Sequence, residues 1–181
     1  MEILNKEYLP MLDQLKAHFQ ENGQISLQKI LTPKALEELQ NSTIQWNKED
    51  KLLYHKYSCA QTNTIINEIL QNELFLSFLQ QLTGKLTTPK KALVYKYTHT
   101  DFSLRTPCKP GILVIIDFGG DFPEGCGGDL CFAHEQDTAT IPSIANSVTL
   151  IHVDEHTESF LTYITHLAGS LERKTIQFLL Q

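Results

Sequence analysis

The feature that most constrains the fold is a change in sequence pattern near residue 90. Before it, apolar residues recur at helical spacing; after it come short runs of β-branched and aromatic residues, separated by turn residues. The runs that predict strands are 92–97, 111–118, 128–132, 147–153, 160–165 and 174–180. We therefore expect helices in the first half of the chain and a sheet in the second.

The first half predicts three helices and one short strand. The first helix ends near Gly23, and a strand follows at 24–27. Thr32 precedes a proline, which is typical of a helix cap and first turn, and it begins the second helix. The apolar stripe of the third helix spans 62–82. These helices are expected to cover one side of the sheet.

Helices followed by six or more strands predict an α+β fold, in which N-terminal helices pack on one sheet of a double-stranded β-helix (jelly-roll, cupin-like). The chain has 181 residues, which suits one domain with a sizeable core. No internal repeat or long linker divides it. We expect a single domain over 1–181, with a helical part at 1–90 and the jelly roll at 91–181.

Charge and hydropathy limit the partners and the location. The formal net charge is −6 and the pI is near 5.6, which argues against a broad nucleic-acid-binding face. No apolar run approaches the ~20 residues of a membrane span, and the first residues lack the pattern of a signal peptide. The sequence thus predicts a cytoplasmic protein with reduced thiols and no membrane association.

A His-x-Asp pattern at 99–101 suggests a metal site. Residues two apart on a strand project from the same face, so His99 and Asp101 could reach one ion. A third ligand from a later strand, His156 or alternatively His166, would complete a 2-His-1-carboxylate triad that leaves positions open on Fe(II). His152 is a further candidate; with 154 and 156 it could alternatively form a separate site on one strand.

A second candidate group could hold a cofactor. Arg173 and Thr175 alternate on the last strand, so a guanidinium and a hydroxyl share a face. Such a pair can bind the distal carboxylate of 2-oxoglutarate, the guanidinium in bidentate fashion. Tyr95 or Tyr97, on the strand at 92–97, could add a hydrogen bond to the same cofactor.

The order of these features resembles a known family. Strand, His-x-Asp, strand, Gly-Gly-x-Leu at 127–130, Ile141-Pro142, strand, histidine, strand and Arg-x-Thr follow one another along the chain. In this order, residues 93–180 resemble the 2-oxoglutarate/Fe(II) oxygenases of the prolyl-hydroxylase branch. The resemblance implies a dioxygenase, an oxidoreductase that uses Fe(II) and 2-oxoglutarate to hydroxylate a protein, at proline for example.

A closer likeness points to a different activity. Segments 97–104 and 160–166 look like the second, degenerate jelly roll of the prolyl hydroxylases that act on a ribosomal protein. In that register the positions of the metal ligands fall at Thr106 and Cys108, with the third near Ser159 or Phe160. The likeness then implies a catalytically inactive jelly roll that binds a protein partner, with translation as one setting.

The two hypotheses differ in which side chains face the interior of the jelly roll. The enzyme requires His99 and Asp101 to point inward, close to a later histidine. The inactive binding domain requires Thr106 and Cys108 in that place.

Overall fold

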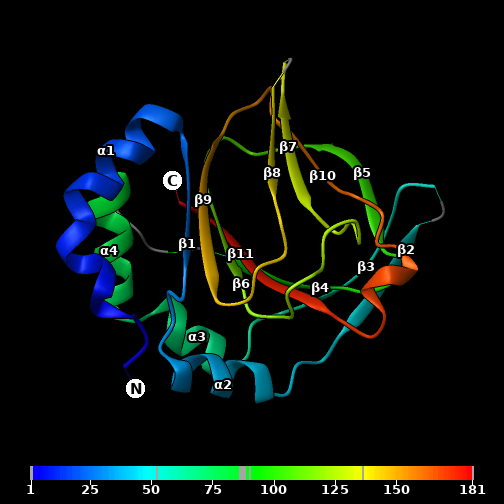
Figure 1. The fold of residues 1–181 in the computed structure, drawn as a ribbon, viewed down its shortest axis with the longest axis horizontal. Coiled ribbons are helices and arrows are strands. Elements are labelled where there is room, and N and C mark those ends of the chain that lie inside the picture. Colours follow the sequence, from blue (N-terminus) through cyan, green and yellow to red (C-terminus); the bar gives the residue numbers. More distant parts are fainter. Residues whose placement is uncertain (1, 52, 86–88, 90, 136, 181) are drawn as a thin grey trace.

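The computed structural model describes residues 2–51, 53–85, 89, 91–135 and 137–180. Helices gather beside one side of a strongly curled sheet (Figure 1). The helices are η1 (Lys6–Met11), α1 (Leu12–Asn22), α2 (Pro33–Asn41), α3 (Thr64–Leu70), α4 (Glu73–Thr83) and η2 (His166–Ala168). The strands are β1 (Gln24–Gln28), β2 (Asn47–Lys51), β3 (His55–Ala60), β4 (Ala92–Tyr97), β5 (Phe102–Pro107), β6 (Gly111–Asp117), β7 (Leu130–His134), β8 (Asp137–Ile141), β9 (Ser147–Val153), β10 (Glu158–Leu161) and β11 (Arg173–Leu180).

The strands form the predicted jelly roll. They pair in the order β1-β9-β6-β11-β4-β3-β5-β10-β7-β8, and β2 pairs with β3. Every named pairing is antiparallel. The sheet curls so that β5, β10, β7 and β8 face β4, β11, β6 and β9 across an interior (Figure 1). The prediction of an α+β jelly roll with N-terminal helices on one sheet is confirmed.

Strand alternation separates a helix-covered face from the interior. On β6, Ile112, Val114 and Ile116 belong to the apolar cluster shared with α1, α2, α3 and α4. Their neighbours Leu113 and Ile115 belong to a second cluster inside the jelly roll. Because successive side chains of a strand point to opposite faces, β11 likewise turns its odd-numbered residues inward. The interior face of β4 and β11 is therefore where a site can form.

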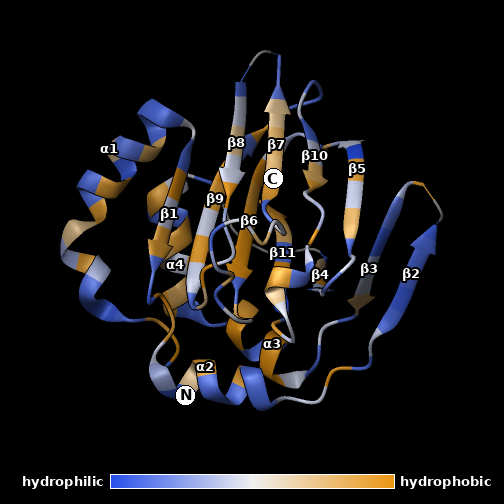
Figure 2. Ribbon diagram, turned by 45° about the vertical axis from the view of Figure 1, so that its right-hand side comes forward, coloured by the Kyte–Doolittle hydropathy of each residue, from blue (hydrophilic) through white to orange (hydrophobic). Residues whose placement is uncertain are grey.

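The first half of the chain differs from the sequence prediction in two ways. The expected helix at 62–82 is two helices, because Asn72 accepts a hydrogen bond from the Phe75 backbone N–H at 3.0 Å and caps α4. The first half also supplies β2 and β3, which the apolar pattern did not predict. β2 has the sequence Asn-Lys-Glu-Asp-Lys, and Figure 2 shows it hydrophilic along its length.

The two halves are interleaved in the sheet. β1, predicted at 24–27, pairs with β9, and β3 pairs with both β4 and β5. β3 thus carries the main sheet over to the second side of the jelly roll. Among the described residues, no helix combines the length and the apolar character that crossing a membrane requires.

Candidate functional site

The His-x-Asp pattern lies in a turn and not on a strand. β4 ends at Tyr97 and β5 begins at Phe102. Asp101 Oδ2 accepts hydrogen bonds from the backbone N–H of Thr98 at 2.8 Å and from its hydroxyl at 3.2 Å, which closes the turn. His99 is exposed, and Asp101 is buried against its own turn. The expectation that the two side chains share a strand face is therefore wrong.

His156, the first choice for the third ligand, lies away from this turn. His156 is exposed in the turn between β9 and β10, where its backbone N–H donates to Asp154 Oδ1 at 2.9 Å. Glu158 pairs with Pro107, so His156 lies near the C-terminal end of β5. His99 precedes the N-terminal end of the same strand. A strand of this length separates its ends by about 17 Å, too far for one ion.

The remaining histidine candidates do not complete a site either. His166 is exposed at the start of η2. β9 ends at Val153, so 152, 154 and 156 do not alternate along one strand. In the described part of the chain, no three His, Cys, Asp or Glu side chains are grouped so that they could hold a metal ion.

Thr106, Cys108 and Ser159 do come together. Ser159 pairs with Thr106 between β10 and β5, and the backbone N–H of Cys108 donates to Thr157 O at 2.8 Å. Burial raises the pKa of the Cys108 thiol, and hydrogen bonds with Ser159 oppose that rise only in part. The three positions thus offer two hydroxyls and a neutral thiol. Fe(II) in a facial triad takes two imidazoles and a carboxylate, so this donor set does not fit the metal.

Arg173, the predicted ligand of the 2-oxoglutarate carboxylate, faces the interior and is hydrogen-bonded within the protein. Its Nη2 and Nε donate to the carboxylate of Asp117 at 2.6 and 3.1 Å. Nη1 donates to the carbonyls of Gly128 at 2.7 Å and Ile141 at 3.0 Å, and Nη2 also reaches Pro142 O at 3.3 Å. A guanidinium carries five N–H donors, so all of them have acceptors. This fully buried arginine has no donor left for the carboxylate of a cofactor.

The ion pair continues into a polar row along β11. Burial raises the pKa of Asp117 to about 6, against the opposing effect of the Arg173 charge. Thr175, the other predicted carboxylate ligand, is buried and accepts a hydrogen bond from Gln177 Nε2 at 3.1 Å. Gln177 also donates to the Tyr97 hydroxyl at 3.3 Å.

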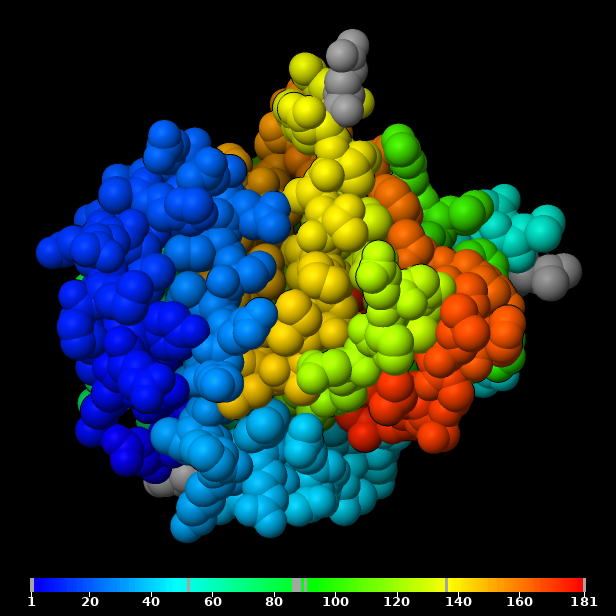
Figure 3. Space-filling view, in the orientation of Figure 1, coloured from blue at the N-terminus to red at the C-terminus, as the bar shows by residue number. Residues whose placement is uncertain are grey.

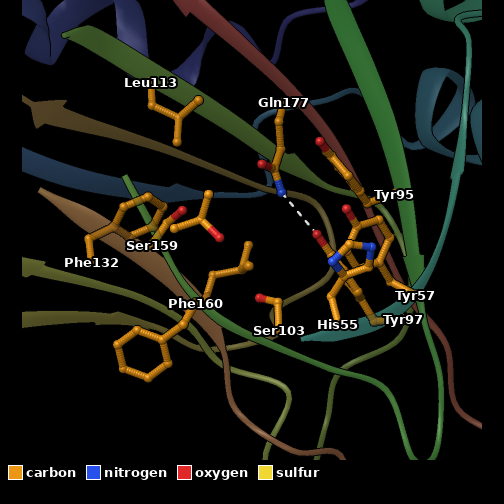
Figure 4. A pocket seen from close by; sticks show the side chains of 12 residues that line it. His55, Tyr57, Tyr95, Tyr97, Ser103, Leu113, Phe132, Ser159, Phe160 and Gln177 are labelled. Atoms are coloured by element: carbon orange, nitrogen blue, oxygen red, sulfur yellow. Dashed lines mark hydrogen bonds between the residues drawn. The ribbon is translucent and has the colours of Figure 1, made fainter. Parts of the chain in front are cut away.

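Beyond Gln177 the interior opens into a cavity of about 170 Å³, the aromatic pocket. Figure 4 shows three tyrosines and a histidine gathered on one side, with Gln177 beside them and Phe132 and Ser159 opposite. Its lining is His55, Tyr57, Tyr95, Tyr97, Ser103, Thr106, Leu113, Leu130, Phe132, Ser159, Phe160 and Gln177. No Asp, Glu, Lys or Arg side chain is among these described residues.

The aromatic wall is held by ring contacts between β3 and β4. Tyr57 meets Tyr95 and Tyr97 edge-on, with ring centroids 5.5 and 6.2 Å apart, and His55 stacks on Tyr57 at 4.9 Å. Such edge-to-face and offset contacts are favourable geometries for aromatic rings. Burial raises the pKa of Tyr95 to about 12 and raises the pKa of Tyr97 well above its usual value, so both hydroxyls stay neutral. The pocket offers apolar surface with a few uncharged hydrogen-bonding groups.

Sequence reasoning found part of this pocket. Tyr95 and Tyr97, which the sequence offered as alternative hydrogen-bonding groups for a cofactor, both lie on its wall. His55 and Tyr57 were missed because β3 was not predicted. Their alternation could have indicated a strand. Gln177 was missed too, although a lone amide within an apolar strand is a signal of a polar interior.

Comparisons with known proteins identify the fold. No protein-family model and no curated protein sequence matches the chain. Several solved structures match the fold of the chain. A prolyl hydroxylase from Trichoplax adhaerens, solved with a hypoxia inducible factor peptide fragment, matches with a TM-score of 0.71 and 12% identity, over 97% of this chain and 91% of that one.

Two further structures agree. A 2OG-Fe(II) family oxidoreductase from Burkholderia pseudomallei has a TM-score of 0.73 at 11% identity, covering 93% of this chain and 89% of its own. A prolyl-4-hydroxylase from Pseudomonas putida has a TM-score of 0.68 at 10% identity, covering 95% of this chain and all of its own (100%). The resemblance to 2-oxoglutarate/Fe(II) oxygenases, prolyl hydroxylases among them, is thus confirmed for the fold.

Proposed function

We propose that this chain uses the fold of the 2-oxoglutarate/Fe(II) oxygenases to bind a peptide segment of a protein partner without oxidising it. One observation carries the proposal. Thr106, Cys108 and Ser159 meet beside an uncharged aromatic pocket, at the positions where the degenerate register puts the metal ligands. The interior therefore keeps a binding cavity while its donors do not suit iron.

The shape and chemistry of the pocket favour a peptide side chain. Its volume of about 170 Å³ compares with roughly 30 Å³ for one water molecule in the liquid, so it holds a group of side-chain size. Tyrosines provide apolar area with a polar tip, which is typical of surfaces that bind peptides and small ligands. The Trichoplax neighbour was solved with a peptide fragment, which supports the same class of ligand.

Neither Fe(II) nor 2-oxoglutarate enters this proposal. His99, Asp101 and His156 are apart, and the Arg173 guanidinium is saturated by Asp117 and three carbonyls. A bidentate arginine site for a carboxylate would require that guanidinium to be free. A cytoplasmic location and a link to translation stay predictions from the sequence.

A random-peptide display library selected on the full chain tests peptide binding. We expect enriched peptides that lose affinity about tenfold or more for Thr106→Trp. Thr106 lies on a strand at the mouth of the pocket, and tryptophan suits strands, so this variant should fold and block the mouth. Equal affinity for both proteins, or no enrichment, would contradict the proposal.

Protein hydroxylation is the second candidate function. The observation that favours it is the fold likeness to two prolyl hydroxylases over 95% or more of this chain. Conversion of 2-oxoglutarate to succinate in the presence of Fe(II) and a library of proline-containing peptides tests it. Succinate at the background rate is expected. Turnover that His99→Ala abolishes would replace the binding proposal with the enzyme.

A further inference from the structure

A second hollow adjoins the mouth of the aromatic pocket. We call it the cationic shelf; it has a volume of about 360 Å³ and is lined by Lys51, Tyr54, His55, Leu104, Arg105 and Thr106. His55 and Thr106 line both hollows, so the two surfaces are continuous. The shelf lies where the end of the β2–β3 hairpin meets β5, at the edge of the molecule shown in cyan and green in Figure 3.

The charge of the shelf is opposite to that of the chain. The formal net charge is −6, yet the shelf is lined by two cations and, among the described residues, by no carboxylate. Lys51 forms no ion pair within the described part of the chain. Arg105 Nη1 lies 3.6 Å from Glu158 Oε2, and both side chains are largely exposed. Because such a surface pair is worth only about 0–1 kcal/mol, an incoming carboxylate can displace it.

Apolar side chains are exposed beside these cations. Leu53, Tyr54 and Leu104 are exposed by 73%, 66% and 51%, among the largest exposed apolar side chains of the described residues. Leu53 also has a φ of 74°, a left-handed conformation that is unfavourable for a leucine. Backbone strain and exposed apolar area are both typical of binding surfaces. The shelf therefore offers apolar contact and positive charge together.

We propose that the shelf and the pocket together bind an acidic peptide in an extended conformation. One uncharged side chain of the peptide enters the aromatic pocket, and neighbouring carboxylates meet Lys51 and Arg105. This inference rests on the proposed peptide binding and adds the charge of the partner. Opposite charges raise the association rate and select the partner. Among the described residues that line the pocket there is no Asp, Glu, Lys or Arg, which suits an uncharged side chain.

The peptides selected on the full chain test this charge preference. We expect acidic sequences with one aromatic or aliphatic residue at a constant position, and binding that weakens as salt is raised. Lys51→Glu should weaken binding about tenfold, as expected for the loss of one charge-assisted contact. Arg105→Gln, which removes the charge but keeps a polar side chain, should act in the same direction.

Lys34→Glu is the matched control. It makes the same change in net charge at an exposed site on α2, away from the shelf, and should leave affinity unchanged. Neutral or basic peptides that are insensitive to Lys51→Glu but weakened by Thr106→Trp would overturn this inference and leave the proposed function standing. Equal weakening by Lys34→Glu would also overturn it, because the attraction would then be non-specific. Absence of any peptide weakened by Thr106→Trp would instead remove the proposed function.

Discussion

The interior of the jelly roll holds two polar regions that differ in how far their groups are satisfied. Around Arg173 every donor has an acceptor, supplied by Asp117 and three backbone carbonyls. The aromatic pocket begins at Gln177, a few residues further along β11. There, the hydroxyl of Tyr95 on β4 has no hydrogen-bond partner among the described residues. Buried polar groups cost free energy unless they are paired. The donors of Arg173 are thus all paired within the chain, whereas the Tyr95 hydroxyl in the second region is not paired with any described residue.

The two regions also differ in how their space is filled. Asp117 supplies from within the chain the carboxylate that pairs with Arg173. Satisfying the arginine internally closes one region and leaves the neighbouring aromatic wall open. An inward-facing arginine therefore does not establish a cofactor site until its partners are known.

Removing the counter-ion of Arg173 should have the largest effect on stability. Asp117→Ala leaves the Arg173 charge buried without its counter-ion, so we expect the free energy of unfolding to fall by about 3–5 kcal/mol. Urea unfolding measures it. Glu172→Ala is the matched control: it removes partly exposed pairs with Lys96 and Lys174 and should cost under about 1 kcal/mol. Similar losses in the two variants would mean that the buried pair has no special role.

Building a metal triad beside the aromatic pocket should have the next largest effect on stability, once Mn(II) is added. Thr106→His, Cys108→Asp and Ser159→His together supply two imidazoles and a carboxylate where these residues meet. With Mn(II) at 100 times its Kd, thermal unfolding should show a stabilisation of about 2.7 kcal/mol. The variant with only the first two changes is the control and should gain less. A folded triple variant that Mn(II) does not stabilise would show that the three side chains do not converge on one ion.

The thiol of Cys108 gives a pH-dependent test of the same place. Because burial raises its pKa, the thiolate fraction at pH 8 is smaller than in an unstructured peptide, and alkylation by iodoacetamide should be slower. Below that pKa the rate should rise about tenfold per pH unit. Peptide-level mass spectrometry follows the reaction. Faster alkylation of Cys108 than of a free cysteine peptide at pH 8 would contradict a neutral thiol.

Two conservative changes compare satisfied and free hydroxyls within the pocket wall. Tyr97→Phe removes the acceptor of Gln177 Nε2 and should cost about 1 kcal/mol. Tyr95→Phe removes a hydroxyl that has no partner among the described residues, so its effect should stay within about 0.5 kcal/mol. Chemical denaturation compares the two variants. A larger cost for Tyr95→Phe would reverse the assignment of the free hydroxyl.

Much of the fold could be predicted because its patterns are local. The apolar strands β4, β6, β9 and β11 stand out by alternation and composition, and their predicted bounds agree with the structure to within a residue. β2 could not be found in this way, since its charged residues form an exposed edge that pairs, within the described part of the chain, with β3 alone. The break between α3 and α4 depends on one capping asparagine within a continuous apolar stripe.

The site was less predictable because it depends on residues far apart in the chain. Alternation correctly placed Arg173 and Thr175 on one face, but the fate of the guanidinium depends on Asp117, on another strand. The error at 99–101 arose because Thr100 adopts a φ of 76°, which a threonine rarely does and which no local pattern indicated. The prediction of a strand at 99–101 was therefore wrong, because the chain forms a turn there.

The central claim is that the interior binds a peptide segment and holds neither iron nor 2-oxoglutarate. The most direct test is a titration of Mn(II) into the unmodified protein in the presence of 2-oxoglutarate, followed by electron paramagnetic resonance. The account predicts that the signal of the hydrated ion persists unchanged at every protein concentration. Loss of that signal in the unmodified protein, restored by His99→Ala, would contradict the account.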